Sequence, residues 1–102
     1  MNIHLHREIK GPNGVYAHMV YPLSTLASPP PLGTSIRLDE ETVRIIDVVY
    51  RFDNGLDVPP TVELWLSRDT FWYDVTDQQG SFQEMIDKYL KKGWRHDQIR
   101  ET

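Results

Sequence analysis

Residues with a branched Cβ dominate this chain, and they favour strands over helices. The 102 residues include 8 Val, 7 Ile and 7 Thr but only 2 Ala. Branched side chains lose rotamer freedom in a helix and pack well on a pleated sheet, whereas Ala is the strongest helix former. Seven Pro and six Gly interrupt the chain at short intervals, which is typical of short strands joined by tight turns. The sequence therefore predicts a β-rich fold.

The chain length allows one small domain with a core of its own. A chain of this size buries about 65% of the surface that its unfolded form exposes. We predict one domain over residues 1–94, followed by a polar, frayed tail over residues 95–102. The absence of Cys excludes disulfides, thiolate metal ligands and cysteine nucleophiles, and it fits a reducing compartment.

The charge balance and the first residues predict a soluble protein. The net charge is −4, whereas proteins that bind duplex nucleic acid usually carry a basic excess. Residues 1–6 alternate apolar and polar side chains, but a signal peptide or a membrane span needs a continuous apolar run. We therefore expect a cytoplasmic protein with no membrane partner.

Alternating apolar and polar residues, separated by turn residues, predict six strands. These strands cover residues 3–9, 15–21, 34–38, 42–52, 61–67 and 70–75. The first two form a hairpin around Pro12, Asn13 and Gly14, which suit a three-residue loop. The fourth strand is apolar on both faces, which indicates a central position, and Asp47 marks a bulge in it.

Residues 22–33 form a long uncharged connection that contains three consecutive Pro. Such a run favours the extended polyproline II conformation, and twelve residues are many for a connection in a small domain. Two interpretations are open. The segment is either a strap that tucks Leu23, Leu26 and Leu32 onto the core, or a lid or partner-docking loop.

One helix is predicted, over residues 81–92. Ser81 and Glu84 form a capping box, apolar side chains recur at helical spacing, and Gly93 supplies a stop after which Trp94 folds back. The whole pattern predicts a β-rich α+β fold. Its antiparallel six-stranded sheet forms a small barrel or curls strongly, with the C-terminal helix packed on it. A flat sheet with the helix on one face is the alternative.

Residues 33–50 resemble the opening hairpin of many small bacterial β-barrels. In those proteins a Gly precedes a short strand, an acidic turn and a long bulged strand, as Gly33, residues 34–38, residues 39–41 and residues 42–50 do here. The whole chain is similar to the uncharacterised small proteins that are common on bacterial gene cassettes and phages. This resemblance implies a compact fold and no known activity, and it assigns no functional residue.

Two His and one carboxylate on the predicted first hairpin form a candidate metal site. The register places Glu8 opposite His18 on the outward face, with His6 beside them. Imidazole and carboxylate groups bind transition metals, and His titrates near neutral pH. The three residues could therefore hold a metal ion or act as an acid–base pair, and a solvated polar face is the plainer interpretation.

Aromatic side chains on the predicted central strands form a second candidate site. Strict alternation directs Trp65 and Trp72 away from their apolar neighbours, so the two indoles share a face, and Tyr50 and Phe52 lie on an adjacent strand. Large apolar patches seldom stay exposed. Either the helix and the barrel interior cover these rings within the monomer, or a partner subunit or ligand covers them.

The C-terminal segment is basic. Residues 88–100 contain five bases and one acid, whereas residues 69–87 contain five acids and no base. One interpretation is a weak nucleic-acid contact in which Trp94 and His96 stack on bases. The other is that both runs of charge complement the dipole of the predicted helix.

The leading functional interpretation is a non-enzymatic binding or assembly module. No serine-hydrolase, phosphate-loop or calcium-loop motif is present in the sequence. We expect a homo-oligomer such as a homodimer, which uses the aromatic group to bind a partner subunit, a protein or a small molecule and needs no cofactor. The alternatives are a small enzyme or metal-binding protein that uses the His and Glu group, and a weak nucleic-acid binder.

Overall fold

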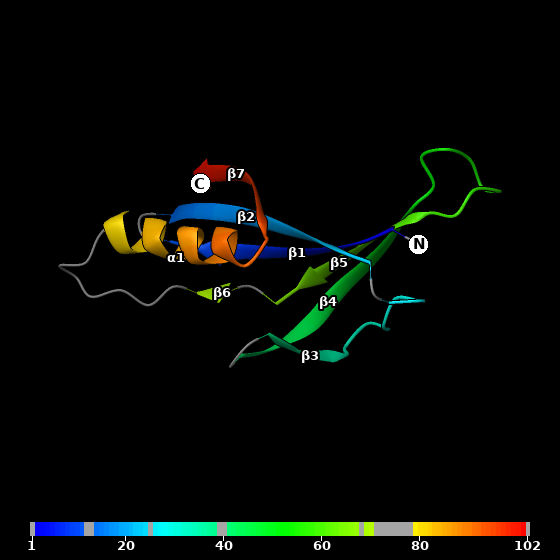
Figure 1. The fold of residues 1–102 in the computed structure, drawn as a ribbon, viewed down its shortest axis with the longest axis horizontal. Coiled ribbons are helices and arrows are strands. Elements are labelled where there is room, and N and C mark those ends of the chain that lie inside the picture. Colours follow the sequence, from blue (N-terminus) through cyan, green and yellow to red (C-terminus); the bar gives the residue numbers. More distant parts are fainter. Residues whose placement is uncertain are drawn as a thin grey trace. The chain divides into compact units, whose positions relative to one another are not determined.

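The computed structural model describes residues 2–11, 14–24, 26–38, 41–67, 69–70 and 79–101. In chain order its elements are β1 (Asn2–Lys10), β2 (Val15–Leu23), β3 (Ser35–Leu38), β4 (Glu41–Arg51), β5 (Thr61–Leu66), β6 (Asp69–Thr70), α1 (Gln79–Lys91) and β7 (Arg95–Glu101) (Figure 1). The described part of the chain is therefore β-rich with one C-terminal helix, which confirms the predicted α+β class.

Hydrogen bonds join the strands in the order β3-β4-β5-β1-β2-β7, and the short β6 pairs with β1. The pairs β3/β4, β4/β5 and β2/β7 are antiparallel, but β1 runs parallel to both β5 and β6. The sheet is thus mixed, and the prediction of a wholly antiparallel sheet is wrong. That prediction paired strands with their neighbours in sequence, whereas β1 and β5 bring together residues 59 positions apart.

The strand order also leaves the sheet open. β3 and β7 lie at opposite ends of the order, and no pairing joins them among the described strands. The sheet therefore does not close into the predicted barrel. One physical reason is the length of β3, whose four residues offer few backbone hydrogen bonds to a closing strand.

The chain divides into two compact units, and each is described by itself. The first consists of Met1–His6 and Pro22–Ser67, and the second of Arg7–Tyr21 and Arg68–Thr102. β1 and β2 therefore contribute residues to both units. The single domain predicted for residues 1–94 stays a prediction.

The first unit contains β3, β4, β5 and the start of β1. Its core side chains are each at most 4% exposed, and they are Ile3, Leu5, Val43, Ile45, Val62, Leu64 and Leu66. β4 lies between β3 and β5, which confirms its predicted central position. The register of β4 against β5 shifts between Ile45 and Asp47, which confirms the bulge predicted there.

The long connection of the first unit is shorter than predicted, because β2 extends to Leu23. In the connection Leu26 is 37% exposed and Leu32 is 63% exposed. A strap would hold these two side chains on the core. The exposed fractions therefore do not support the strap interpretation.

The helix of the second unit packs closely on Gly11, the residue that follows β1. Phe82 and Ile86 are fully buried. A Cβ on Gly11 would lie 2.6 Å from the ring of Phe82, so the ring leaves no room for a side chain at residue 11. The helix begins at Gln79, two residues before the predicted capping Ser81, so the predicted capping box is wrong.

The helix ends as predicted. Gly93 adopts a left-handed φ of 96°, which suits a glycine that terminates a helix. The Trp94 amide then donates to the Tyr89 carbonyl at 3.1 Å, and the Trp94 ring lies 5.4 Å from the rings of Tyr89 and Tyr21. Trp94 therefore folds back on the last turn.

Residues 95–101 form a strand, so the prediction of a frayed tail is wrong. β7 pairs with β2 from Val15 to Val20. Its sequence is polar because it is the last strand in the order, where hydrogen bonds to one neighbour suffice and charged side chains are common. Polarity alone therefore did not distinguish an edge strand from a disordered end.

Several sequence predictions lie outside the described residues. They include Pro12 and Asn13 of the first turn, residues 39–40 of the acidic turn, and residues 71–78, which hold Trp72 and most of the predicted sixth strand. Within the described residues, no helix has the length and apolar character needed to cross a membrane.

Candidate metal centre

Two histidines of β1 project from the same face of the first unit. Along β1 the side chains alternate, so buried Ile3 and Leu5 point to one face and His4 and His6 to the other. Spacing of two residues on a strand therefore brings the two imidazoles together, with their ring centroids 6.4 Å apart.

The parallel pairing of β1 with β5 adds a carboxylate to these histidines. Glu63 is the register partner of His4, and Trp65 is the register partner of His6. Paired residues on adjacent strands project from the same face. Glu63 thus lies directly across from His4 and diagonally across from His6, in a strand whose other face is apolar.

The three side chains meet through their polar atoms. His4 Nδ1 lies 3.3 Å from Glu63 Oε1 and 3.2 Å from Oε2, and His6 Nε2 contacts Oε2. Glu63 is only 5% exposed, whereas the His4 side chain is 30% exposed. The cluster is therefore buried on its carboxylate side and open to solvent at His4.

Arg51 of β4 also contacts the Glu63 carboxylate. Its Nη1 lies 3.0 Å from Glu63 Oε1, and its Nε donates to Asp53 Oδ2 at 3.0 Å. The bulge in β4 sets this arrangement, because beyond it Val49 and Arg51 pair with Glu63 and Thr61 and share their face. Oε1 thus accepts from Arg51, while Oε2 faces both imidazoles.

The environment lowers the pKa of Glu63 below its usual value of 4.5. Burial by itself raises this pKa, because it disfavours the charged carboxylate. The hydrogen bond and charge of His6 and the charge and hydrogen bond of His4 outweigh burial. Glu63 is therefore an anion at neutral pH.

Trp65 covers one side of the cluster. Its ring stacks on the His6 imidazole with centroids 4.4 Å apart and planes at 17°. A stacked indole restricts the rotation of the imidazole and excludes water from its face. His6 is consequently held in one orientation by Glu63 at its edge and Trp65 on its plane.

The cluster offers two nitrogen atoms and one oxygen atom at distances that suit a metal ion. The ligand atoms of His4, His6 and Glu63 all lie within 4.8 Å of one another, and among the described residues this is the group of three with that property. In a tetrahedral zinc site two ligand atoms lie about 3.4 Å apart. The 3.2 Å between His4 Nδ1 and Glu63 Oε2 is close to that spacing.

The residues that form the candidate metal site differ from those predicted from the sequence. Of the predicted residues it includes His6, but neither Glu8 nor His18 belongs to the group. His18 instead lies in the second unit, where its Nδ1 is 3.0 Å from Asp97 Oδ2. The prediction matched β1 with β2, its neighbour in sequence, and so it missed Glu63 on β5.

The missed residues did carry a signal in the sequence. His4 and His6 have the alternate spacing that places two ligands on one face of a strand. Glu63 is the one charged residue in the strand Thr61–Leu66. A buried charge is rarely found without a partner.

The described aromatic residues of the predicted binding site do not share one face of the sheet. Trp65 lies on the face of Glu63, but Tyr50 pairs with Val62 and therefore points to the opposite face. Phe52 follows the end of β4 and is 43% exposed, and Trp72 lies outside the described residues. Trp65 and Tyr50 thus do not line one pocket.

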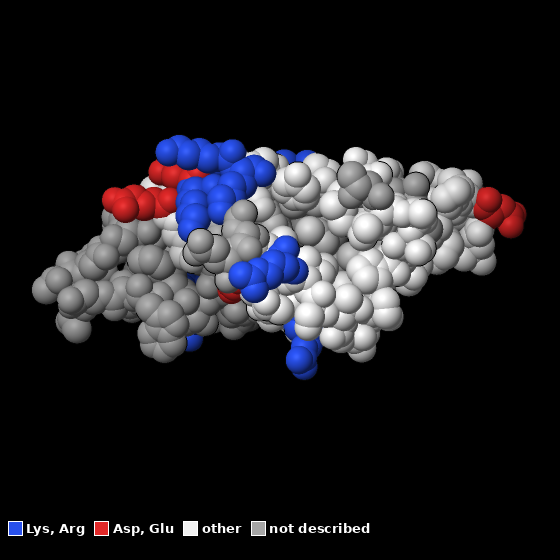
Figure 2. Space-filling view, turned by 60° about the horizontal axis from the view of Figure 1, so that its bottom comes forward, with Lys and Arg blue, Asp and Glu red and all other residues white. Residues whose placement is uncertain are grey.

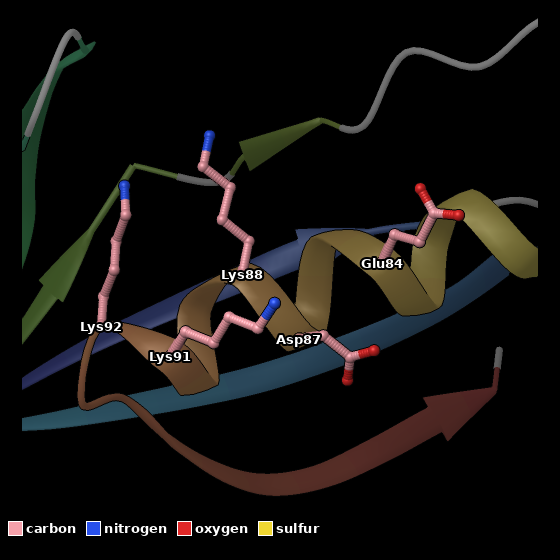
Figure 3. A pocket seen from close by; sticks show the side chains of 5 residues that line it. All are labelled: Glu84, Asp87, Lys88, Lys91 and Lys92. Atoms are coloured by element: carbon pink, nitrogen blue, oxygen red, sulfur yellow. The ribbon is translucent and has the colours of Figure 1, made fainter.

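Acidic and basic side chains on α1 and just after it line a hollow, and three of them belong to the basic segment. Its lining residues are Glu84, Asp87, Lys88, Lys91 and Lys92. Lys88 and Lys92 extend to one side of the helix, and Lys91 and Asp87 extend from the other (Figure 3). Blue and red side chains accordingly gather together in the space-filling view (Figure 2).

Stacking on nucleic-acid bases is not available to the aromatic residue at this end of the helix. Trp94 is only 9% exposed, and its ring packs against Tyr21 and Tyr89. The arrangement of charge follows the helix instead, because Lys88 and Lys91 lie in its last turn, where cations are favoured.

No protein-family model, curated protein sequence or solved structure matches this chain. The resemblance to small proteins of gene cassettes and phages stays a prediction.

Proposed function

We propose that this protein binds a divalent transition-metal ion through His4 Nδ1, His6 Nε2 and Glu63 Oε2. The observation that carries this proposal is the convergence of these three ligand atoms on one face of the first unit. A buried carboxylate needs a positive partner. A metal ion held between the three ligand atoms would supply a positive charge beside Glu63.

The donor set favours particular ions. Imidazole and carboxylate groups suit Zn²⁺, Co²⁺, Ni²⁺ and Fe²⁺, whereas Mg²⁺ and Ca²⁺ take oxygen ligands. Three protein ligands leave at least one position of a tetrahedral ion for a further ligand. The exposed side of His4 gives that position access to solvent.

Arg51 and Trp65 support the proposed ligands. Arg51 bonds to Glu63 Oε1, so it can orient the carboxylate without occupying Oε2, which both imidazoles contact. Trp65 fixes the plane of His6 through the stacked contact. Such outer interactions orient ligands in metal sites, and their loss typically weakens metal binding by about 10- to 100-fold.

Calorimetric titration of the metal-free protein with Zn²⁺ tests the proposal. We expect one ion per chain, and we expect Glu63→Gln and His6→Gln to weaken binding by more than about 100-fold, because each removes a direct ligand. Glu84→Gln on exposed α1 and His96→Gln on β7 are matched controls that keep wild-type affinity. Mg²⁺ serves as the ion that does not bind.

Two results would contradict the proposal. One is the absence of Zn²⁺, Co²⁺ and Ni²⁺ binding to a folded wild-type protein. The other is binding that survives in both the Glu63→Gln and the His6→Gln variants, because the ion would then occupy a different site.

A second candidate function is assembly with a second copy of the chain. Apolar side chains on and beside β4 support it: Ile46 is 57% exposed, Val49 39%, Tyr50 48% and Phe52 43%. Large apolar patches seldom stay exposed on a monomer. Tyr50 pairs with Val62 and so lies on the face opposite to Glu63 and the metal cluster.

Sedimentation velocity tests the assembly proposal. We expect the wild-type protein to form a dimer or larger assembly at micromolar concentration, and Tyr50→Glu with Phe52→Glu to produce a monomer. A wild-type protein that stays monomeric over the accessible concentration range would contradict this proposal and leave the metal proposal unaffected.

A further inference from the structure

We propose that the ion at His4, His6 and Glu63 takes a small oxyanion, a carboxylate or a phosphate, as its further ligand, and that Arg51 binds the same anion. This inference rests on the proposed metal-binding function and names the ligand class of that site. It is carried by the way the structure holds the Arg51 guanidinium.

Arg51 is held in place but not buried. Its Nε and Nη1 atoms bond to Asp53 and Glu63, while its side chain is 52% exposed. Arg51 makes no hydrogen bond or ion pair through Nη2 to any residue that the structure describes. A guanidinium has five N–H donors, so a positioned edge of Arg51 remains free for a ligand.

The charges around this edge favour an anion. A divalent ion, the carboxylates of Glu63 and Asp53 and the guanidinium of Arg51 together leave one net positive charge if both imidazoles are neutral. The buried setting of Glu63 weakens screening by solvent. An anionic ligand would neutralise the site, whereas a neutral or cationic ligand would not.

The geometry favours an anion with at least two oxygen atoms. Arg51 Nη1 and the two imidazoles contact the two oxygens of the same carboxylate, so the guanidinium and the ion would lie on neighbouring sides of Glu63. An oxyanion can place one oxygen on the ion and another on the guanidinium, which pairs with carboxylates and phosphates through parallel N–H donors. A halide is a single atom, so it cannot span the ion and the guanidinium through two separate oxygens as an oxyanion does.

Anion titration of the Co²⁺-loaded protein tests this inference. Cobalt has visible absorption bands that report directly on its ligands, so saturation with metal can be verified before any anion is added. We expect acetate and inorganic phosphate, each titrated separately, to change the bands of the wild-type protein, and chloride at the same ionic strength to have a smaller effect.

Two substitutions of Arg51 and one control distinguish the part that Arg51 plays in anion binding from the part played by the metal ion. We expect Arg51→Gln, measured at a Co²⁺ concentration that saturates this variant, to weaken acetate and phosphate binding by about tenfold or more, because a charge-assisted contact is lost. Arg51→Lys, which keeps the charge but not the planar fork, should fall between Arg51→Gln and wild type. Arg44→Gln, an exposed arginine of the same strand, should behave as wild type.

Each other outcome overturns part of the account. Equal anion affinity in wild type and Arg51→Gln, with Co²⁺ bound to both, overturns the role of Arg51 and leaves the metal proposal standing. If Co²⁺ cannot be loaded onto Arg51→Gln, the comparison uses Arg51→Lys, and anion affinity equal to wild type in Co²⁺-saturated Arg51→Lys overturns the inference. If the wild-type protein fails to bind Co²⁺, the proposed function itself fails.

Discussion

At the scale of single residues, Glu63 is the centre of the first unit's polar face. It is a 5% exposed carboxylate whose oxygens face two imidazoles and one guanidinium. The alternation of residues in Thr61–Leu66 predicted that Trp65 points away from its apolar neighbours, and Glu63 shares that face. The identity of its partners was not predictable, because that depends on which distant strand lies beside β5.

The lowered pKa of Glu63 predicts how stability depends on pH. A carboxyl group whose pKa is lower in the folded protein stabilises the fold above its unfolded pKa, near 4.5, and loses this contribution as the pH falls through the folded pKa. In the metal-free protein we expect Glu63→Gln to reduce the free energy of unfolding by about 1–3 kcal/mol at pH 5.5. The difference from wild type should shrink by pH 3.

Urea unfolding of both proteins at the two pH values measures this effect. Glu84→Gln, which changes an exposed carboxylate on α1, controls for the general effect of removing a negative charge. A wild-type to Glu63→Gln difference that is the same at pH 3 and pH 5.5 would contradict the pKa assigned to Glu63.

At the scale of elements, local patterns predicted the elements better than they predicted the pairing. Strands β1 to β5 and the helix stop at Gly93 follow from alternation and turn residues, which are properties of short segments. The parallel β1/β5 pair and the edge strand β7 depend on contacts between distant segments. Such contacts leave little trace in the residues of either strand alone.

The contact between Gly11 and α1 gives a prediction about packing. In Gly11→Ala the new Cβ would lie 2.6 Å from Phe82, so the ring or the backbone must move. We expect a loss of about 1–3 kcal/mol in unfolding free energy, which is typical of an overpacked core. Urea unfolding of the metal-free protein measures the loss.

A double-mutant cycle distinguishes overpacking from a backbone effect. Phe82→Leu removes ring atoms that meet the new methyl group, so Gly11→Ala should cost less in the Phe82→Leu background than in wild type. Equal costs in the two backgrounds would show that contact with the Phe82 ring is not the cause.

At the scale of the whole molecule, the order of strands in the mixed sheet determines which side chains form the candidate site. His4 and His6 come from the first strand of the chain, and Glu63 arrives beside them only because β5 pairs in parallel with β1. The predicted hairpin of β1 and β2 is present as well, but it lies on the other side of β1 from β5. The predicted fold class was therefore correct at a coarse level, whereas the predicted metal ligands lacked Glu63 because the parallel pairing of β5 with β1 was not predicted.

The proposed function requires that one metal ion binds at His4, His6 and Glu63. A crystal structure of the Zn²⁺-loaded protein, with diffraction recorded above and below the zinc absorption edge, locates the ion directly. We predict one anomalous peak about 2.0–2.2 Å from His4 Nδ1, His6 Nε2 and Glu63 Oε2. A peak at His18 and Asp97 or at another surface group, or no peak at this cluster, would contradict the claim.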